Sequence, residues 1–283
     1  MLFEMAIADA YGAGFEYAPK DFVAKHNDLG GFVVHPKHRQ TAGTYTDDTQ
    51  MALAIAEMIT ERRPWTRETL AQKFVDVFKR DPRSGYSQRF YWFLREVRDG
   101  REFLARIDPR SEKSGAAMRS PPLGLYPAIG TVLELAELNA RLTHATGPGI
   151  ASAQAAALLA HYLRHDLGPP DKIGRFLEQQ VPYRYAWSKP WRGGIGPSGL
   201  EAVHAAAYVI ARSTSLAELL QRAVALTGDV DTVAAMALAA ASTSPHFLHN
   251  LPRVLAQNLE GGPYGASYLQ RLDQALLKKL PGK

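Results

Sequence analysis

The sequence predicts an all-α protein that folds as one domain over residues 1–283. Apolar residues recur at helical spacing along most of the chain, whereas the alternating pattern typical of strands is nearly absent. Alanine is concentrated on the predicted helix faces, in runs such as AAALLA and AAMALAAAS, and small side chains let helix axes approach closely. Because no repeat or linker divides the chain, we expect one compact bundle of many helices.

Each predicted helix has its own apolar stripe. The stretch after Asp48 places apolar side chains at the i, i+3, i+4, i+7, i+8 spacing of a buried face: Met51, Ala54, Ile55, Met58 and Ile59. Met236 lies on a similar stripe, so we expect it in the core with Met51 and Met58. Comparable patterns predict helices over residues 67–80, 128–144, 150–165, 172–181, 200–213, 215–226, 231–242 and 268–280. Only residues 30–36, GGFVVHP, are a fair strand candidate.

Composition excludes several classes of site. The chain has no cysteine, which rules out disulfides, thiolate zinc sites and thiol nucleophiles, and makes a cytoplasmic location the expectation. It shows neither a signal peptide nor a run of about 20 apolar residues, so we expect a soluble protein with no membrane contact. Its 33 basic and 28 acidic residues suit an anionic ligand such as a phosphate ester, while no motif indicates nucleic acid. We expect a monomer.

Two acidic motifs stand at predicted helix starts. Asp47 and Asp48 follow Thr46, and both carboxylates could simply complement the helix dipole, worth about 0.3–1 kcal/mol each, with Thr46 as N-cap. Nearly two hundred residues later Asp229, Asp231 and Thr232 repeat this chemistry at the entrance to another apolar helix. The repetition favours a shared function over two independent caps.

If both helix starts face one space, they bring four carboxylates and up to two threonine hydroxyls together. Such an oxygen-only set suits Mg²⁺ or Mn²⁺ and does not suit zinc. Like charges packed so closely are costly without a cation between them, and two metal ions about 3.5–4 Å apart commonly hold such a set. The adjacent aspartates therefore predict a binuclear metal site.

The order and spacing of five motifs resemble the ADP-ribosylglycohydrolases. The motifs are AIADAYGAGFEY, YTDDTQMALAIAE, SGAAMRSPPLG, LTH and TGDVDTVA, and the resemblance runs from about residue 5 to residue 245. It implies an all-α fold with two Mg²⁺ or Mn²⁺ ions at the helix N-termini. It also implies hydrolysis of the glycosidic bond between ADP-ribose and a modified acceptor, which is an ADP-ribosylated protein or another ADP-ribosylated molecule. The product is free ADP-ribose, and we slightly prefer an arginine-linked acceptor.

Carried over position by position, the resemblance assigns roles to individual residues. The implied metal ligands are Thr46, Asp47, Asp48, Asp229, Asp231 and Thr232. The implied catalytic residues are Glu16, Asp48 and Asp231, and the implied ADP-ribose contacts are Ser114, Gly115, Ala116, Met118, Arg119 and His144. A glycine-containing turn that opens a helix presents N–H groups to a pyrophosphate, which agrees with residues 114–119. The chain departs from the family pattern at Ala8, Ser114 and Thr227, none of which removes a ligand.

Several residues have simpler interpretations. His144 could cap a helix or edge the core, Arg119 could cover a helix end instead of a phosphate, and Tyr185, Trp187 and Trp191 more often anchor a loop than stack on adenine. Two other functions compete with glycoside hydrolysis. An inactive family member could bind ADP-ribose or serve as a structural protein, and DVDTV at residues 229–233 fits the DxDx[TV] signature of phosphohydrolases. That signature requires a preceding strand, whereas residues 215–226 are predicted to be helical.

Overall fold

The computed structural model describes residues 1–280, and it confirms the all-α prediction. No β-strand forms in this range, and its β-type pairings are isolated bridges such as the one between Arg110 and His144. The first helices are α1 (Leu2–Ala13), α2 (Lys20–His26), α3 (Asp47–Thr60), α4 (Arg67–Arg80), α5 (Gln88–Glu96), α6 (Gly100–Arg106), α7 (Gly115–Met118), the 3₁₀ turn η1 (Pro121–Leu125) and α8 (Ile129–Arg141). They are followed by α9 (Gly147–Arg164), η2 (Pro170–Lys172), α10 (Ile173–Gln180), α11 (Gly199–Ile210), α12 (Leu216–Ala225), α13 (Val230–Ala241), α14 (Arg253–Asn258) and α15 (Ala266–Lys279).

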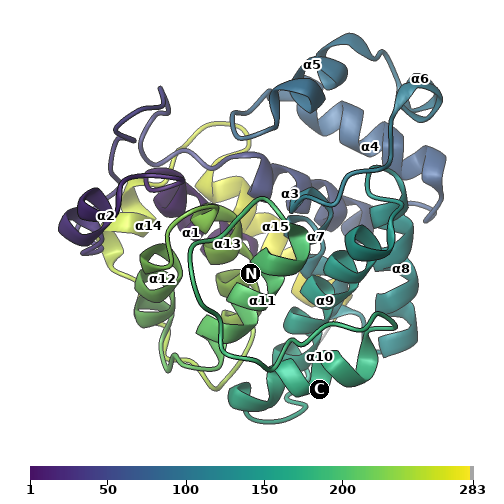
Figure 1. The fold of residues 1–283 in the computed structure, drawn as a ribbon. Helices are drawn as coiled ribbons and strands as arrows, with labels where there is room; N and C mark the ends of the chain where they lie inside the picture. Colours follow the sequence, from purple (N-terminus) through teal and green to yellow (C-terminus); the bar gives the residue numbers. More distant parts are fainter. Residues whose placement is uncertain (281–283) are drawn as a thin grey trace.

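The core is built around α13, in which every residue is buried. Helix α1 packs along it, α9, α11 and α12 also contact it, and α5 and α6 project at one corner of the molecule (Figure 1). Close packing of α1 on α13 depends on Gly12, because a Cβ there would lie 2.5 Å from the Cα of Asp231. Small side chains at this contact thus allow the close approach of helices that the sequence predicts. Met51, Met58 and Met236 are all buried, as expected.

A buried ion-pair network joins α3, α4 and α15. The carboxylate of Glu57, only 2 % exposed, accepts hydrogen bonds from Lys73 and Arg80 of α4 and from the Tyr268 hydroxyl of α15. Lys73 also pairs with Glu61 at 2.8 Å. Because Glu57 is removed from water, these partners must satisfy its charge inside the protein.

The structure differs from the sequence-based predictions at three local points. Helix α1 was not predicted, because it is apolar on nearly all sides and lacks an amphipathic stripe. The strand candidate at residues 30–36 is unpaired, and its Val33 packs instead against the chain at Gly14, where a Cβ would lie 2.7 Å from the Val33 side chain. Thr46 occupies the N-cap position of α3, but its side chain does not cap the helix.

Candidate metal and active site

One cavity of 800 Å³ gathers side chains from four distant segments. Glu16 and Tyr17 come from the turn after α1, Asp47 and Asp48 from the start of α3, and Asp229, Asp231 and Thr232 from the start of α13. The turn at the start of α7 contributes Ser114 and Gly115. Five of the six predicted metal ligands therefore line the same space, while Thr46 lies just behind it.

The acidic side chains in this cavity can approach a common cation. One carboxylate oxygen from each of Glu16, Asp229 and Asp231 lies within 4.8 Å of the other two. Asp48 Oδ1 and Asp231 Oδ1 are buried without a hydrogen-bond partner in residues 1–280. Unpaired buried carboxylate oxygens are costly unless a cation or proton satisfies them, so these residues fit a hard divalent metal ion.

The electrostatics agree with a cation-binding site. Burial and the charges of Asp9 and Asp47 hold the pKa of Asp48 well above its ordinary value. Burial together with Glu16 and Asp48 does the same to the pKa of Asp231. Burial, reinforced by Asp229 and Asp9, raises the pKa of Glu16 to about 7. Each carboxylate is thus destabilised in its charged form by its neighbours, and a bound cation would offset that repulsion.

The loop before α13 holds Asp229 in place. Thr227 and Gly228 adopt left-handed backbone angles, with φ of 65° and 96°. A Cβ on Gly228 would lie 2.1 Å from the carbonyl oxygen of Ile195, so only glycine fits there. The Asp229 N–H donates to that carbonyl at 3.2 Å, and the Ser114 hydroxyl donates to Asp229 Oδ2 at 3.2 Å.

Asp9 was not predicted as a site residue, yet it organises the start of α3. Its carboxylate accepts hydrogen bonds from the backbone N–H and hydroxyl groups of both Thr46 and Thr49, at 2.6–3.1 Å. A carboxylate on α1 therefore caps α3, in place of the Thr46 side chain. The sequence signals were an aspartate set among the apolar residues of MAIADAYGA and its place in the first of the five family motifs.

The predicted ADP-ribose loop contributes only some of its residues to the cavity. Ser114, Gly115, Met118 and Arg119 line it, whereas Ala116 packs against Ala140 and Ala153. Helix α7 is a single turn of four residues, so a helix dipole adds little to anion binding here.

Arg119 and His144 occupy buried positions in the cavity wall. The Arg119 guanidinium donates to Gly115 O, to Asn139 Oδ1 and O, and to Thr143 Oγ1, at 2.6–2.9 Å. It therefore braces the loop from within and, through its bond to Asn139 O, also covers the C-terminal end of α8, which is the simpler of the two interpretations offered by the sequence. His144 is 6 % exposed, and its Nε2 has no hydrogen-bond partner within residues 1–280.

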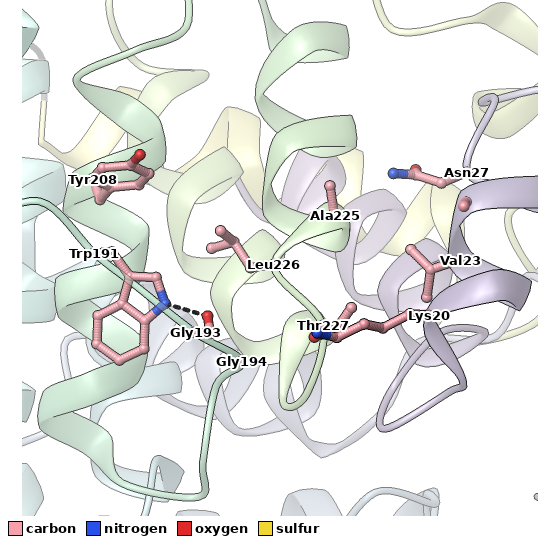
Figure 2. A pocket seen from close by; sticks show the side chains of 11 residues that line it. Lys20, Val23, Asn27, Trp191, Gly193, Gly194, Tyr208, Ala225, Leu226 and Thr227 are labelled. Atoms are coloured by element: carbon pink, nitrogen blue, oxygen red, sulfur yellow. Dashed lines mark hydrogen bonds between the residues drawn. The ribbon is translucent and has the colours of Figure 1, made fainter.

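The three loop aromatics lie outside this cavity. Trp187 is buried and packs on Tyr185 with ring centroids 4.5 Å apart, which fits a loop anchor. Trp191 lines a separate cavity of 470 Å³ with Tyr208 and Lys20, and its Nε1–H donates to Gly193 O (Figure 2). None of the three therefore lines the acidic cavity.

Several residues of the acidic cavity were not predicted. They include Tyr17 at its mouth, Thr143 beside His144, the aromatic residues Tyr86, Phe90 and Phe93, and the basic residues Arg89, Arg106, Arg110 and Lys113. Phe90, Phe93 and Arg89 lie on α5, a helix that was not predicted from the sequence. The cavity thus combines carboxylates with basic and aromatic side chains.

Known structures show the class of this fold. A solved structure described as an ADP-ribosylglycohydrolase-related protein complex matches with a TM-score of 0.75 at 23% identity, over 98% of this chain and 95% of that chain. The fold is therefore that of the ADP-ribosylglycohydrolases. It excludes the phosphohydrolase alternative, because α12 and not a strand precedes residues 229–233.

Sequence comparisons show the family itself. The ADP-ribosylglycohydrolase family model matches residues 1–281, so the chain belongs to that family. ADP-ribosylhydrolase ARH3 of Xenopus tropicalis is 33% identical over 145 residues, which cover 48% of this chain and 41% of that protein. ARH3 of Bos taurus is 27% identical over 299 residues, covering 86% of this chain and 81% of that protein. As to membranes, no helix within residues 1–280 is both long and apolar enough to cross one.

Proposed function

We propose that this protein hydrolyses the glycosidic bond at C1 of the distal ribose in ADP-ribosylated molecules and releases ADP-ribose. The observation that carries the proposal is the shared cavity. A single space of 800 Å³ is lined by the acidic motifs and by the turn at Ser114 and Gly115, together with His144. Family membership supports the reaction class, and the cavity supplies both the acidic centre and nearby basic side chains for a diphosphate.

We propose that two Mg²⁺ or Mn²⁺ ions bind between the starts of α3 and α13. Their ligands would be Thr46, Asp47, Asp48, Asp229, Asp231 and Thr232. Such ions, when bound, would orient ribose hydroxyls and a water molecule and stabilise developing charge. The buried, unpartnered oxygens of Asp48 and Asp231 support this assignment.

Glu16 would either activate the attacking water or position the substrate, and its place beside the carboxylates of Asp229 and Asp231 suits the first role. In the metal-free protein, burial and nearby carboxylates raise the pKa of Glu16 to about 7. Cations bound at those carboxylates would lower this pKa and leave Glu16 ionised, as a general base requires. As the water oxygen bonds to C1 and the C1–acceptor bond breaks, Glu16 would take the proton of the water. The acceptor would leave with its bonding electron pair and receive that proton from Glu16.

An arginine-linked acceptor is favoured by the chemistry of the cavity mouth. Tyr17 is 49% exposed there. Burial of part of its ring and the charges of Asp229 and Glu16 raise the pKa of its phenol to about 12. An exposed aromatic face among carboxylates suits a guanidinium cation.

The competing function is an inactive protein that binds ADP-ribose or serves as a structural component. The presence of all six proposed ligands favours catalysis.

Turnover is measured with arginine- and serine-linked ADP-ribosyl peptides in Mg²⁺ or Mn²⁺. Asp48→Ala and Asp231→Ala should each abolish release of ADP-ribose while circular dichroism stays helical, and Asp21→Ala on the exposed face of α2 is the control. Normal activity in the Asp48→Ala/Asp231→Ala double variant would refute the binuclear site, and binding of ADP-ribose without turnover would favour the competing function.

A further inference from the structure

A chain of hydrogen bonds connects Arg119 to His144 within the cavity wall. Arg119 Nη2 lies 2.8 Å from Thr143 Oγ1, and Thr143 Oγ1 lies 2.7 Å from His144 Nδ1. All three side chains are buried. Because water does not reach these buried groups, the direction of each hydrogen bond depends on which of them can donate a proton and which can accept one.

The guanidinium determines the direction of the whole chain. Arginine has donors and no acceptor, so Thr143 Oγ1 accepts from Arg119 and has one proton left to donate. His144 Nδ1 is the remaining partner of that hydroxyl within residues 1–280. The hydroxyl has a second lone pair and could accept from an Nδ1–H, but its own proton would then have no acceptor within residues 1–280. This favours Nδ1 as the acceptor, and a neutral His144 ring then carries its hydrogen on Nε2.

His144 is held in its neutral form. Burial and the positive charge of Arg119 lower the pKa of His144 to about 3. The ring is therefore neutral near pH 7 and has a single N–H donor, which lies at Nε2.

Arg119 is itself fixed by neutral groups. Its Nε donates to Asn139 Oδ1 at 2.6 Å and its Nη1 to Gly115 O at 2.7 Å, while the guanidinium carbon lies 4.8 Å from the centre of the Phe74 ring. No carboxylate pairs with Arg119 among the hydrogen bonds and salt bridges of the described residues. Its charge is therefore not cancelled locally and acts on His144.

The Nε2 edge of His144 lies beside Gly115 in the cavity wall. Nε2 is buried and has no partner within the described part of the chain, and both His144 and Gly115 line the cavity. A Cβ at Gly115 would lie 3.2 Å from His144 Cε1 and 3.5 Å from Nε2. The absence of a side chain at residue 115 thus keeps this side of the imidazole free of a Cβ contact.

We propose that Arg119 and Thr143 are positioning residues that fix the Nε2–H tautomer of His144, so that this N–H donates to an oxygen atom of bound ADP-ribose. The identity of the ligand rests on the proposed function, whereas the tautomer does not. The inference gives Arg119 an indirect role in binding, through His144 and not through a phosphate.

The tautomer is read by long-range ¹H–¹⁵N correlation NMR on protein labelled at its histidines, with His144 assigned by its loss in His144→Gln. Wild type and Thr143→Ser should carry the hydrogen on Nε2, because serine keeps the hydroxyl. Thr143→Val removes that hydroxyl and should populate the Nδ1–H form. Thr60→Val, which removes a hydroxyl bonded only to carbonyls of its own helix, is the matched control and should leave His144 unchanged.

Calorimetric binding of ADP-ribose provides the second measurement. Thr143→Val should weaken binding about tenfold, the effect of losing one well-oriented hydrogen bond, while Thr143→Ser and Thr60→Val stay within about twofold of wild type. An Nδ1–H tautomer in wild type would overturn the proposal. So would a Thr143→Val variant whose tautomer is unchanged, whatever its affinity. If wild type carries the hydrogen on Nε2 but does not bind ADP-ribose, the tautomer stands. That result would instead contradict the proposed function and the ligand assigned to this donor.

Discussion

Asp9 and Thr46 are joined through both the backbone and the side chain of the threonine. The Asp9 carboxylate accepts the Thr46 N–H at 2.9 Å and the Thr46 hydroxyl at 2.8 Å. A buried residue in the middle of α1 therefore sets where α3 begins, and with it the positions of Asp47 and Asp48. The Thr46 hydroxyl also lies 3.4 Å from Asp48 Oδ2, which links this cap to the acidic cavity.

Asp9→Ala should destabilise the protein by about 1–3 kcal/mol, because the N–H groups of Thr46 and Thr49 lose their buried acceptor. Urea denaturation followed by circular dichroism measures the change. Asp76→Ala, on the exposed face of α4, is the control and should cost less than about 0.5 kcal/mol. Equal effects of the two substitutions would show that Asp9 does not act as the cap.

Metal removal should lower the melting temperature, since the buried carboxylates repel one another without a cation. Mg²⁺ or Mn²⁺ at about a hundred times its dissociation constant should restore about 2.7 kcal/mol if the unfolded chain does not bind. The Asp47→Asn/Asp229→Asn double variant should melt nearly independently of metal, because both the repulsion and the ligands are reduced. A wild-type melting curve unchanged by EDTA, after demonstrated metal removal, would contradict convergence of the two motifs on a metal.

The metal-free protein should become less stable as pH rises from about 5 to 8. Unfolded Glu16 loses its proton near 4.5, whereas the folded protein holds it until about 7. The folded state therefore binds more protons in this window, and stability falls by up to about 3 kcal/mol from this residue. Glu16→Gln should reduce the slope, while the buried aspartates with raised pKa values keep the rest of it, and Glu134→Gln on the exposed side of α8 should leave it unchanged. Chemical denaturation at several pH values in EDTA measures how the free energy of unfolding depends on pH. A dependence that Glu16→Gln leaves unchanged would contradict the prediction.

Tyr17→Ala should lower kcat/KM for arginine-linked substrates up to about tenfold, because a cation–π contact at the mouth is lost. Serine-linked substrates, whose acceptor is neutral, should change less than about twofold. Tyr17→Phe keeps the aromatic face and should behave like wild type. Tyr208→Ala, in the separate cavity of Figure 2, is the control for loss of a tyrosine elsewhere. If Tyr17→Ala lowers kcat/KM equally for both kinds of substrate, Tyr17 does not contact the arginine acceptor.

Glu57→Ala should destabilise the protein by about 3–5 kcal/mol, because it leaves Lys73 and Arg80 without their buried partner. Glu61→Ala removes another partner of Lys73, but this carboxylate is 38% exposed and the loss should be below about 1 kcal/mol. Urea denaturation of both variants compares them directly. Similar values would mean that burial does not govern the strength of this network.

Sequence predicted those features that depend on local pattern. The acidic starts of α3 and α13 were visible because each precedes an alanine-rich apolar stretch. Helix α1 was hidden because burial on nearly all sides removes the amphipathic signal, and the roles of Asp9 and Arg119 depend on partners 37 and 24 residues away. Residues 30–36 have strand-like composition, but their neighbour in the fold is the end of α1, which offers no strand to pair with.

The separation of the acidic segments along the chain has a consequence during synthesis. Asp9, Glu16, Asp47 and Asp48 leave the ribosome between about 180 and 220 residues before Asp231 does. At roughly 5–20 residues per second this interval is on the order of ten to forty seconds. During it the first carboxylates have no partner segment, and helix α1 lacks the α13 surface against which Gly12 packs. The nascent chain would therefore expose an apolar helix until most of the protein has been translated, and the metal site would be among the last features to form.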